Sequence, residues 1–441
     1  MKVCIVGGGP CGLYMAYELG KRGHAVELYE KENYIGGCWA SVYHNNLFTE
    51  HAPRMFFDNY GNTIEFFKDI GIDFHTHFKK VFSVFIDSFS IINDVSAYDL
   101  LSLTFAYLSP LSTWKGYTVF EMCEYYNIST NGRKALNSIC YTIDGVSMYK
   151  MTTVEFLDTI DKTLLYNGYE SRSNSNEYMI PKIKAALKKY KVHIHTNTTL
   201  KYFSGDDAFF ENNTILSKTK CDAYLICIPP PFFANALRLS DEKYKHAWGD
   251  FDTFNNLCTR SYYSGIGIQF HFDESQSPIH FKSKTIGEWH IISSYNVQSS
   301  CISCVIVDTQ LKSTYLKKYI HDMSKDEIMR ETWRQLMIEW VSMGNIVPNA
   351  LPQMTMTQDL GAHGAFLYTG ENIPSCPITN VPIRYVGSHN QTNIPFTSIE
   401  ATIESAKRFL SVKNIYTPIS FKSLLYPILF VLIYSISSSE S

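Results

Sequence analysis

The sequence predicts an α/β fold, and three observations support this prediction. A short apolar segment at residues 3–6, a helical pattern at 12–21 and a second apolar segment at 25–29 have the order strand, helix, strand. A glycine-rich stretch joins the first two of these segments. Further on, a lysine-edged helical pattern and a strand within 180–195 are followed by an apolar strand at 221–228, so the second block resembles the first. Such alternation is typical of a parallel sheet with helices on its faces.

The periodicity of the remaining apolar residues predicts further elements. Helices are predicted over residues 99–108, 180–190, 324–343 and 397–410, and strands over 192–195, 221–228, 266–272, 301–307 and 385–387. Ser324, with Glu327 three residues later, is typical of a capping box at the start of a helix. The strands at 266–272 and 301–307 are expected to be antiparallel.

The composition is that of a folded and nearly neutral chain. Hydrophobic residues make up 45% and charged residues 18% of the 441 residues, which excludes a disordered chain. Lys and Arg total 39 and Asp and Glu total 42, and the resulting net charge of -3 excludes a strongly basic nucleic-acid-binding protein. At roughly 150 residues per domain, the length predicts two or three domains. The 11 cysteines are too dilute for a disulfide framework, and no secretory signal precedes the first strand, so we expect a reducing, cytoplasmic location.

The glycine-rich stretch is the most specific signal in the chain. Gly7-x-Gly9-x-x-Gly12 follows the first strand directly and opens the first helix, as in the dinucleotide-binding motif of Rossmann-like domains. The three glycines permit a tight turn, a close approach of the backbone to a pyrophosphate, and close packing of the helix on the strand. Pro10 and Cys11 lie inside the motif, where the free N–H groups of the helix point at the phosphates, and are predicted to bind the cofactor as well.

A carboxylate ends the second strand. Glu30 stands eighteen residues after the last glycine of the motif, where it can accept hydrogen bonds from both ribose hydroxyls. It would repel a free 2′-phosphate, which disfavours NADP and leaves NAD and FAD as alternatives. Lys31 follows directly, and the nearby Gly36-Gly37 pair with Cys38 could bring a second backbone segment close to the phosphates or the ribityl chain.

These features resemble the superfamily of flavin-containing amine oxidases, protoporphyrinogen oxidases and carotenoid desaturases. The glycine pair is similar to the double-glycine motif of FAD proteins of the glutathione-reductase type, although Cys38 stands where the family usually has arginine. The segment 49–54 (TEHAPR) resembles the family's loop beside the flavin ring. The resemblance implies that Pro53 and Arg54 contact the flavin. Arg54 is the candidate catalytic residue near the ring or a substrate carboxylate, with a structural salt bridge under the flavin as the alternative.

Two later segments carry the same resemblance. Residues 199–200 and 221–230 are similar to the family's second FAD-domain segment, in which the backbone of Leu200 would meet the adenine. Residues 383–388, which include Gly387, and 397–401 are similar to the C-terminal FAD motif. In that motif Ser398 and Ile399 would begin a helix whose N-terminus faces the pyrimidine edge of the flavin and stabilises negative charge there.

The resemblance implies one FAD that is bound without a covalent link. Cys376 lies too close to Gly387 to be the cysteine to which some amine oxidases attach their flavin, and no second nucleotide motif follows that would bind NADPH. No metal site is expected. Cys301 and Cys304 should point to opposite faces of an apolar strand. The pairs His75 with His77 and His193 with His195, each taken as alternating on one face of a strand, have no evident carboxylate partner.

The complete prediction is a Rossmann-like FAD-binding domain of the glutathione-reductase type that is interleaved with an α+β substrate domain. The predicted boundaries are 1–60, 171–236 and 376–410 for the FAD-binding domain, 61–170 and 237–375 for the substrate domain, and 411–441 for a C-terminal tail. The aromatic residues are concentrated in the substrate domain between residues 56 and 149 and are predicted to line an apolar cavity.

The resemblance also implies an activity, namely an oxidoreductase that transfers hydride from a C–H or C–N centre to the flavin N5. Amine-oxidising members place a lysine near N5 and an aromatic residue before the C-terminal motif, and a gapless comparison puts Gly267 and Ser398 at these positions. Amine oxidation by the usual site is therefore disfavoured. We expect a small-molecule substrate that is largely apolar or an amine, and no nucleic-acid partner. The alternative is a non-catalytic protein that keeps FAD as a structural core and binds a partner.

An apolar segment lies near the end of the chain. Residues 424–436 (LLYPILFVLIYSI) would span roughly 20 Å as a helix, less than the roughly 30 Å hydrocarbon core of a bilayer. Two interpretations stay open. The segment packs on the body or is a disordered tail, or it makes a membrane contact that anchors an otherwise cytoplasmic protein.

Overall fold

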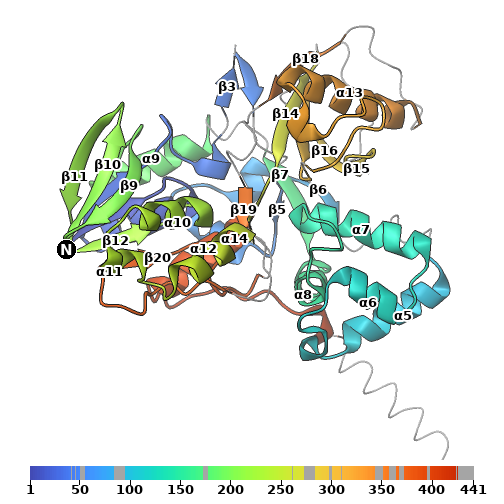
Figure 1. The fold of residues 1–441 in the computed structure, drawn as a ribbon, viewed down its shortest axis with the longest axis horizontal. Coiled ribbons are helices and arrows are strands. Elements are labelled where there is room, and N and C mark those ends of the chain that lie inside the picture. The colour runs from blue at the N-terminus through green and yellow to red at the C-terminus, as the bar shows by residue number, and fades with distance from the viewer. Residues whose placement is uncertain are drawn as a thin grey trace, which may run out of the picture.

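The chain forms three units in the computed structural model (Figure 1). A unit with a parallel sheet lies at the left, a unit with an antiparallel sheet at the upper right, and a helical unit at the lower right. The structure describes residues 1–40, 42–44, 46–49, 55–83, 95–171, 177–260, 262–272, 284–296, 300–308, 310–342, 351–356, 364–366, 372–394, 398–423 and 425.

The first unit, called the sheet unit, is built on five parallel strands from distant parts of the chain. Their order across the sheet is β20-β12-β1-β2-β8, with bounds β1 (Lys2–Val6), β2 (Ala25–Tyr29), β8 (His193–His195), β12 (Ala223–Ile226) and β20 (Ile383–Tyr385). The central strand β1 pairs with β2 on one side and with β12 on the other, so the strand order reverses there. Ligands of open parallel sheets bind at such a reversal, beyond the carboxyl ends of the strands.

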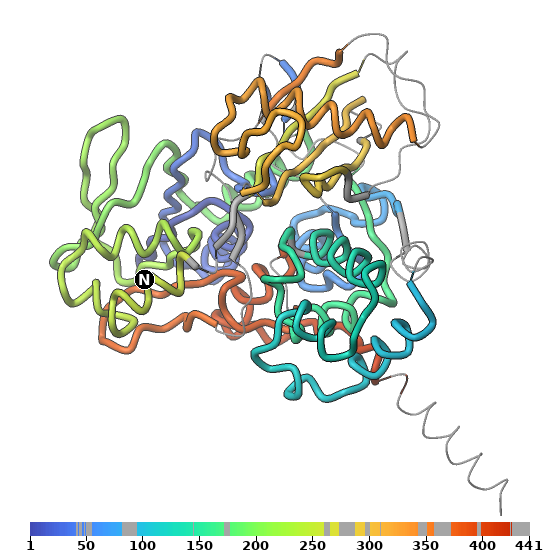
Figure 2. The backbone as a smooth tube through the Cα atoms, turned by 45° about the vertical axis from the view of Figure 1, so that its right-hand side comes forward, coloured from blue at the N-terminus to red at the C-terminus, as the bar shows by residue number. Residues whose placement is uncertain are grey.

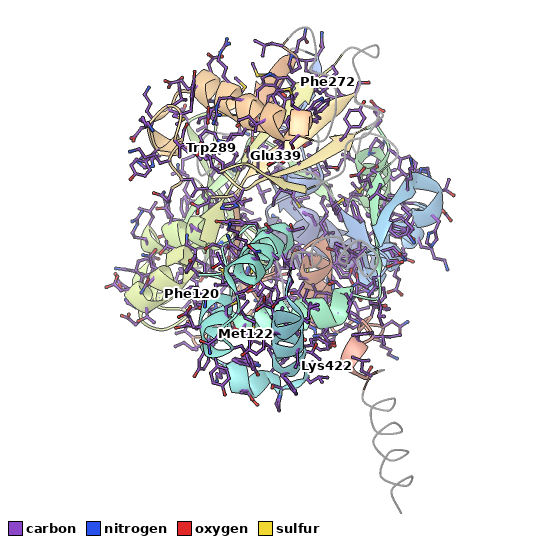
Figure 3. The ribbon with its side chains drawn as sticks, turned by 90° about the vertical axis from the view of Figure 1, so that its right-hand side faces the viewer. Phe120, Met122, Phe272, Trp289, Glu339 and Lys422 are labelled. Atoms are coloured by element: carbon purple, nitrogen blue, oxygen red, sulfur yellow. The ribbon has the colours of Figure 1, made fainter. Side chains whose placement is uncertain are left out.

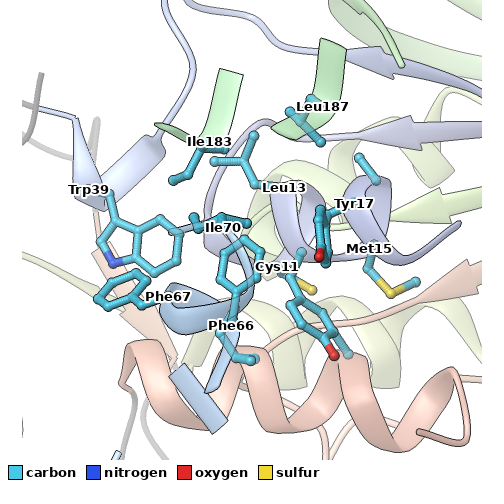
Figure 4. Packing of buried hydrophobic residues seen from close by; sticks show 14 of the residues in the cluster. Cys11, Leu13, Met15, Tyr17, Trp39, Phe66, Phe67, Ile70, Ile183 and Leu187 are labelled. Atoms are coloured by element: carbon cyan, nitrogen blue, oxygen red, sulfur yellow. The ribbon is translucent and has the colours of Figure 1, made fainter. Parts of the chain in front are cut away.

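Helices bury both faces of this sheet. One face is covered by α1 (Pro10–Lys21), α2 (Gly61–Asp69), α9 (Met179–Lys189) and α14 (Ile399–Phe409). The other face is covered by α10 (Pro230–Arg238), α11 (Glu242–Lys245), α12 (Phe251–Arg260) and a small sheet of β9 (Thr199–Ser204), β10 (Asp207–Asn212) and β11 (Ile215–Lys220). Figure 4 shows the first face, where Leu13 and Tyr17 of α1 pack among Phe66 of α2 and Ile183 of α9. The assignment of 61–170 and 237–375 to a substrate domain stays a prediction, and α2 and α12 from these segments pack on the sheet.

The second unit is a five-stranded antiparallel sheet that one long helix covers. The strand order is β15-β16-β17-β14-β18, with bounds β14 (Ile266–His271), β15 (Lys284–Ile286), β16 (Ile291–Asn296), β17 (Cys301–Ile306) and β18 (Gln353–Met356). The helix α13 (Lys325–Ser342) packs on the face that carries Ile266, Ile268 and Phe270. Ser324 and Glu327 bond each other's backbone N–H groups at 3.3 and 2.9 Å, which confirms the predicted capping box.

The helical unit has its own core. It consists of α5 (Ala97–Leu108), α6 (Val119–Tyr125), α7 (Thr130–Asp144), α8 (Thr153–Thr163) and the short 3₁₀ helix η2 (Leu111–Trp114). Trp114, Met122 and Phe156 pack at the centre of this unit. The chain trace in Figure 2 shows these helices stacked to one side of the two sheets.

Small elements connect the units. They are the hairpin β3 (Val42–His44) and β4 (Leu47–Thr49), the sheet of β5 (Phe56–Phe57), β6 (Phe78–Ser83) and β7 (Asn167–Ser171), the pair β13 (Tyr262–Ser264) and β19 (Gly364–Phe366), the helix α3 (Phe74–His77), and the 3₁₀ helices η1 (Gly37–Trp39) and η4 (Ile320–Asp322).

Residues 411–423 form a segment that links the sheet unit to the helical unit. The ring of Tyr416 lies where a Cβ on Gly61 would be, 2.2 Å from its nearest atom, so only glycine fits there. Further along, the Lys422 N–H donates to Asp161 Oδ1 of α8 at 2.8 Å. Of the apolar segment 424–436, only residue 425 lies within the described part of the chain. Within that part, none of the helices combines the length and the apolar character that crossing a membrane requires.

The structure corrects two expectations about aromatic and histidine residues. Phe56, Phe67 and Phe78 are at most 4% exposed and pack ring against ring at 4.6 to 6.0 Å, so they form core and do not line a cavity. His75 and His77 lie in the short helix α3 and not on a strand, because Asp73 caps a helical turn there by accepting from the Thr76 N–H at 2.7 Å.

A third correction concerns the other histidine pair. Glu27 on the neighbouring strand lies 2.6 Å from His195 Nε2 and 3.4 Å from His193 Nδ1, so the pair does have a carboxylate partner. The sequence separates these residues widely, and only the pairing of β2 with β8 brings them together. Within the described ranges, no group of three His, Cys, Asp or Glu residues is arranged to hold a metal ion.

Candidate dinucleotide-binding site

The loop between β1 and α1 is packed so tightly that glycine is required at two positions. A Cβ on Gly12 would lie 1.9 Å from the carbonyl oxygen of Gly7, so any side chain would force the helix off the strand. Gly7 has a φ of +104°, and its Cβ would lie 2.6 Å from the carbonyl oxygen of Cys227, at the end of β12. The structure thus places these two motif glycines where the sequence predicted a tight turn and close packing of helix on strand.

Gly9 differs from its neighbours because it faces open space. A Cβ at this position would meet nothing within 4 Å. Gly9 is also the N-cap of α1, with no side-chain cap on the helix and no acidic residue in its first turn. The uncapped N-terminus, followed by Pro10, carries free N–H groups and positive partial charge beside this space. An anion such as a pyrophosphate fits this arrangement.

The carboxylate of Glu30 lies next to the glycine loop. Its Oε2 accepts from the Gly8 N–H at 2.6 Å and its Oε1 from the Glu32 N–H at 2.9 Å. The side chain is buried, and burial raises the pKa of Glu30 above its ordinary value. Each carboxylate oxygen still has a free lone pair, so Glu30 can accept hydrogen bonds from ribose hydroxyls in addition.

The glycine pair 36–37 packs directly on the same loop. The Gly36 N–H donates to the Gly8 carbonyl at 2.8 Å, and a Cβ on Gly37 would lie 2.8 Å from Gly9 Cα. Both have positive φ, at +124° and +51°, which favours glycine. The second backbone segment therefore lies beside the predicted phosphate position, as the spacing suggested.

The carboxyl end of β20 meets the start of α1. The thiol of Cys11 is 3.3 Å from the carbonyl oxygen of Val386, so this side chain points toward β20 and its buried surroundings. Gly387 follows, and a Cβ there would collide with the imidazole of His389 at 2.7 Å. Asn390 closes the turn by accepting from the Gly387 N–H at 3.0 Å. Residues more than 370 positions apart thus form one edge of the site.

The N-terminus of α14 has a different arrangement. Ser398 caps the helix, with its Oγ accepting from the Ala401 N–H at 3.0 Å, and Ile399 packs against the core. The carboxylate of Glu400 accepts from the N–H groups of Asn62 and Thr63, both at 2.8 Å, and from their side chains. Glu400 therefore accepts the hydrogen bonds of the free N–H groups at the N-terminus of α2 and so holds α2 against α14.

The remaining predicted site residues lie at different distances from this loop. Leu200 is buried in β9 and pairs with Phe210, in the core that covers the second face of the sheet. Lys31 is partly exposed, with its ammonium 3.3 Å from Glu32 and over the ring of Phe232. Cys38 is partly buried in η1. Pro53 and Arg54 lie outside the described residues.

The strand at the expected lysine position carries a row of buried polar residues. On β14, Gln269 lies two residues after Gly267, on the face opposite to α13. Its register partners are Ser303 on β17 and Thr355 on β18, and Ser303 pairs in turn with Ser294 on β16. Gln269 Nε2 donates to Ser303 Oγ at 3.2 Å. The hydroxyl of Ser294 donates to Glu170 of β7 at 2.6 Å, and burial raises the pKa of Glu170.

Sequence reasoning missed three groups around the site. Gly8 could have been suspected from the run of three glycines, since a Cβ there would lie 3.0 Å from Glu30 Oε2. Glu400 lies in the segment 397–401 that resembles the C-terminal FAD motif, but no local pattern marks its contact with Asn62, 338 positions away, or the turn that Asn390 closes.

The arrangement passes a simple test for a dinucleotide. Open space lies at Gly9, an uncapped helix N-terminus borders it, and the buried carboxylate of Glu30 lies beside it. These three groups have the chemistry that a pyrophosphate and an adjoining ribose require.

Comparisons with known proteins agree with this geometry. Residues 5–70 match the model of an NAD(P)-binding Rossmann-like domain. A zeta-carotene desaturase from Zea mays is 32% identical over 96 residues, which cover 22% of this chain and 17% of that enzyme. The chain spans less than a fifth of the length of the curated relatives it matches.

Solved structures are similar over almost the whole chain. An oxidoreductase from Methanosarcina mazei has a TM-score of 0.63 at 11% identity, with 93% of this chain and 100% of that chain covered. Cyclohexylamine oxidase from Brevibacterium oxydans has a TM-score of 0.61 at 11% identity, with 92% and 97% covered. The predicted α/β fold is confirmed, and so is the resemblance to the superfamily of flavin-containing amine oxidases, protoporphyrinogen oxidases and carotenoid desaturases.

Proposed function

We propose that this chain binds FAD without a covalent link and is an oxidoreductase of the amine oxidase and desaturase superfamily. One observation carries the proposal, which is the contact of Gly36 and Gly37 with Gly8 and Gly9 beside the open N-terminus of α1. A plain dinucleotide loop needs only the first glycine motif, whereas a second glycine segment on the same loop is typical of the FAD proteins that the sequence resembles.

Each group around the loop has a role toward the cofactor. The first turn of α1 binds the pyrophosphate, and Glu30 accepts the hydroxyls of the adenosine ribose. Gly36 and Gly37 allow close approach of the backbone, Gly387 borders the same site from β20, and the backbone of Leu200 reaches the adenine. Bound FAD would supply the acceptor, at its N5, for a hydride from a C–H or C–N centre of the substrate.

The substrate is proposed to be a small molecule that is largely apolar or an amine. The polar row around Gln269 stands on the strand where amine-oxidising members place their lysine, so this chain offers an uncharged amide there. The related structures include cyclohexylamine oxidase and a putrescine oxidase bound to putrescine, while matched sequences include zeta-carotene desaturases. These relatives define the first substrates to test.

Absorption spectroscopy on the purified full chain tests the proposal. We expect the absorption bands of flavin, release of FAD on denaturation, and bleaching of the bands under anaerobic conditions by at least one amine, polyene, porphyrinogen or amino acid. Bound FAD that no substrate reduces would favour the alternative of a non-catalytic FAD-containing binding protein. A protein that takes up NAD and no FAD would overturn the proposal altogether.

A further inference from the structure

One helix of the helical unit exposes an apolar stripe. On α5, Tyr98 is 59% exposed, and Leu101 and Phe105 are each 56% exposed. Their spacing of three and then four residues places them on one face of the helix. Leu100, 36% exposed, widens the stripe. Single exposed apolar residues are common on proteins, whereas a contiguous apolar patch marks a surface that meets another apolar phase.

No charged side chain interrupts this surface. Between residues 95 and 114 the sequence contains one charged residue, Asp99, and no lysine or arginine. Asp99 is buried on the inner side of α5, where its carboxylate accepts from the Ser129 N–H at 2.8 Å and from the Ser129 hydroxyl at 2.5 Å. The side chains that α5 itself exposes are therefore apolar or uncharged.

A second observation connects α5 to the apolar segment 424–436. The segment 411–423 ends beside the C-terminal end of α5, where the Lys422 ammonium lies 3.4 Å from the Ser109 carbonyl oxygen and 4.7 Å from the centre of the Tyr107 ring. The Phe421 ring is 6.4 Å from the same tyrosine ring, between centroids. Figure 3 shows Lys422 at the outer edge of the helical unit. In the sequence, the largely apolar residues 424–436 follow almost directly, so the described part of the chain ends next to α5 with an apolar stretch still to come.

We propose that the exposed face of α5 and the segment 424–436 together rest on a lipid bilayer. Packing of the segment on α5 would cover only part of its side chains, and because its sequence is apolar almost throughout, the others would stay in water. A bilayer would cover both the exposed face of α5 and the apolar side chains of the segment. Thirteen residues are too few to cross the hydrocarbon core, so the contact lies in the plane of the membrane. Because α5 itself has no basic residue and the Lys422 ammonium is held by the Ser109 carbonyl oxygen and the Tyr107 ring, attraction to anionic lipid contributes little.

Flotation of the full chain with vesicles tests this surface. Wild-type protein is expected to float with vesicles of neutral phosphatidylcholine, equally at low and at high salt. The double substitution Leu101→Glu with Phe105→Glu should lower the bound fraction about tenfold or more, because two charges enter the contact. The matched control is Ile338→Glu on α13, where an equally exposed apolar residue (58%) lies outside the stripe and binding should not change. Thermal unfolding should be alike for all three proteins.

Three outcomes would overturn the proposal. Normal flotation of the double variant would remove α5 from the contact. Binding that needs anionic lipid and disappears at high salt would make the contact electrostatic. If the wild-type chain does not float, and amide exchange at residues 98–105 rises when 426–441 is deleted, the segment covers α5 within the protein itself. None of these results depends on bound FAD, so they leave the proposed function untouched.

Discussion

The start of α1 and the starts of the helices in the helical unit satisfy their backbone N–H groups in opposite ways. Ser96, Thr118, Ser129 and Thr152 each cap a helix of the helical unit, and each side chain accepts a backbone N–H of the first turn. At α1 the N-cap is Gly9, which has no side chain to offer. Free N–H groups at a helix start need a partner, and among the described residues no side chain caps α1, so a ligand could supply that partner.

The glycines sharpen this comparison. At Gly12 the place that a Cβ would take is filled by the Gly7 carbonyl oxygen, so a side chain does not fit. At Gly9 the corresponding place is empty, so a side chain would fit and the residue is still glycine. Packing explains Gly12, whereas the open space at Gly9 would suit a ligand that approaches the backbone closely. Gly9 therefore differs from Gly12 in having room for a ligand beside its backbone. Substitutions at these positions and a change of pH test this difference.

Gly12→Ala should damage the fold itself. The new methyl group would overlap the Gly7 carbonyl oxygen at 1.9 Å, and both partners are backbone atoms that cannot turn away. We expect the free energy of unfolding to fall by about 3 kcal/mol or more. Denaturant titration, or the soluble yield if the protein does not fold, measures this. Unchanged stability would show that the strand and helix are less closely packed than described.

Gly9→Asp should abolish cofactor binding and leave the fold intact. The backbone at this position is extended, with φ of -77° and ψ of -177°, which suits a capping aspartate, and the side chain has room. The carboxylate would occupy the place of the pyrophosphate and repel it. We expect FAD affinity to fall by about 100-fold or more, and the cofactor-free protein to gain about 0.5 kcal/mol of stability. Tight FAD binding by this variant would contradict the assignment of the site.

Ser129→Ala should do the reverse, with a loss of stability and no effect on the cofactor. The hydroxyl caps α7 by accepting from the Gly132 N–H at 3.1 Å and donates to the buried Asp99. We expect a loss of about 2 kcal/mol, compared with about 1 kcal/mol for the exposed cap in Thr118→Ala. Differential scanning calorimetry and an FAD titration would measure both effects. A change in FAD affinity would mean that the two units are coupled.

Changing the pH should separate the two roles of Glu30. Burial raises its pKa in the folded protein, so in the cofactor-free state the carboxyl contributes stability at low pH that is lost as the pH rises through the folded pKa. Ribose binding needs the ionised form, so FAD affinity should fall as the pH drops through the same value, by roughly tenfold per pH unit below it. Glu30→Gln should bind FAD more weakly and without this pH dependence. An identical pH profile for both proteins would remove Glu30 from the ribose site.

Local spacing determined what the sequence could predict. The strand, glycine loop, helix and Glu30 lie within thirty residues, and the Gly36-Gly37 pair follows at once, so their proximity could be inferred without knowledge of the rest of the chain. The same holds for the capping box of Ser324 and Glu327, where one helical turn contains both partners.

Contacts between distant segments could not be predicted in this way. Glu400 bonds Asn62 across 338 positions, and Glu27 meets His193 through strand pairing alone. The aromatic residues near Phe56 and Phe67 show the same limit, because an aromatic-rich stretch can either line a cavity or fill a core. Only the packing of α2 on α1 shows that these residues belong to the core. The stripe on α5 was also hidden, since a helical pattern does not say whether its apolar face will be covered.

The strand order of the sheet unit also has a consequence for the time at which the protein becomes functional. The central strand β1 is made long before its sheet partners on one side, because β12 follows after more than 200 residues and β20 after more than 370. At roughly 5 to 20 residues per second, β20 emerges from the ribosome roughly 20 to 75 seconds after β1. During this interval the first glycine loop has no completed sheet beneath it. A dinucleotide is therefore expected to bind only late in synthesis, after β20 has joined the sheet.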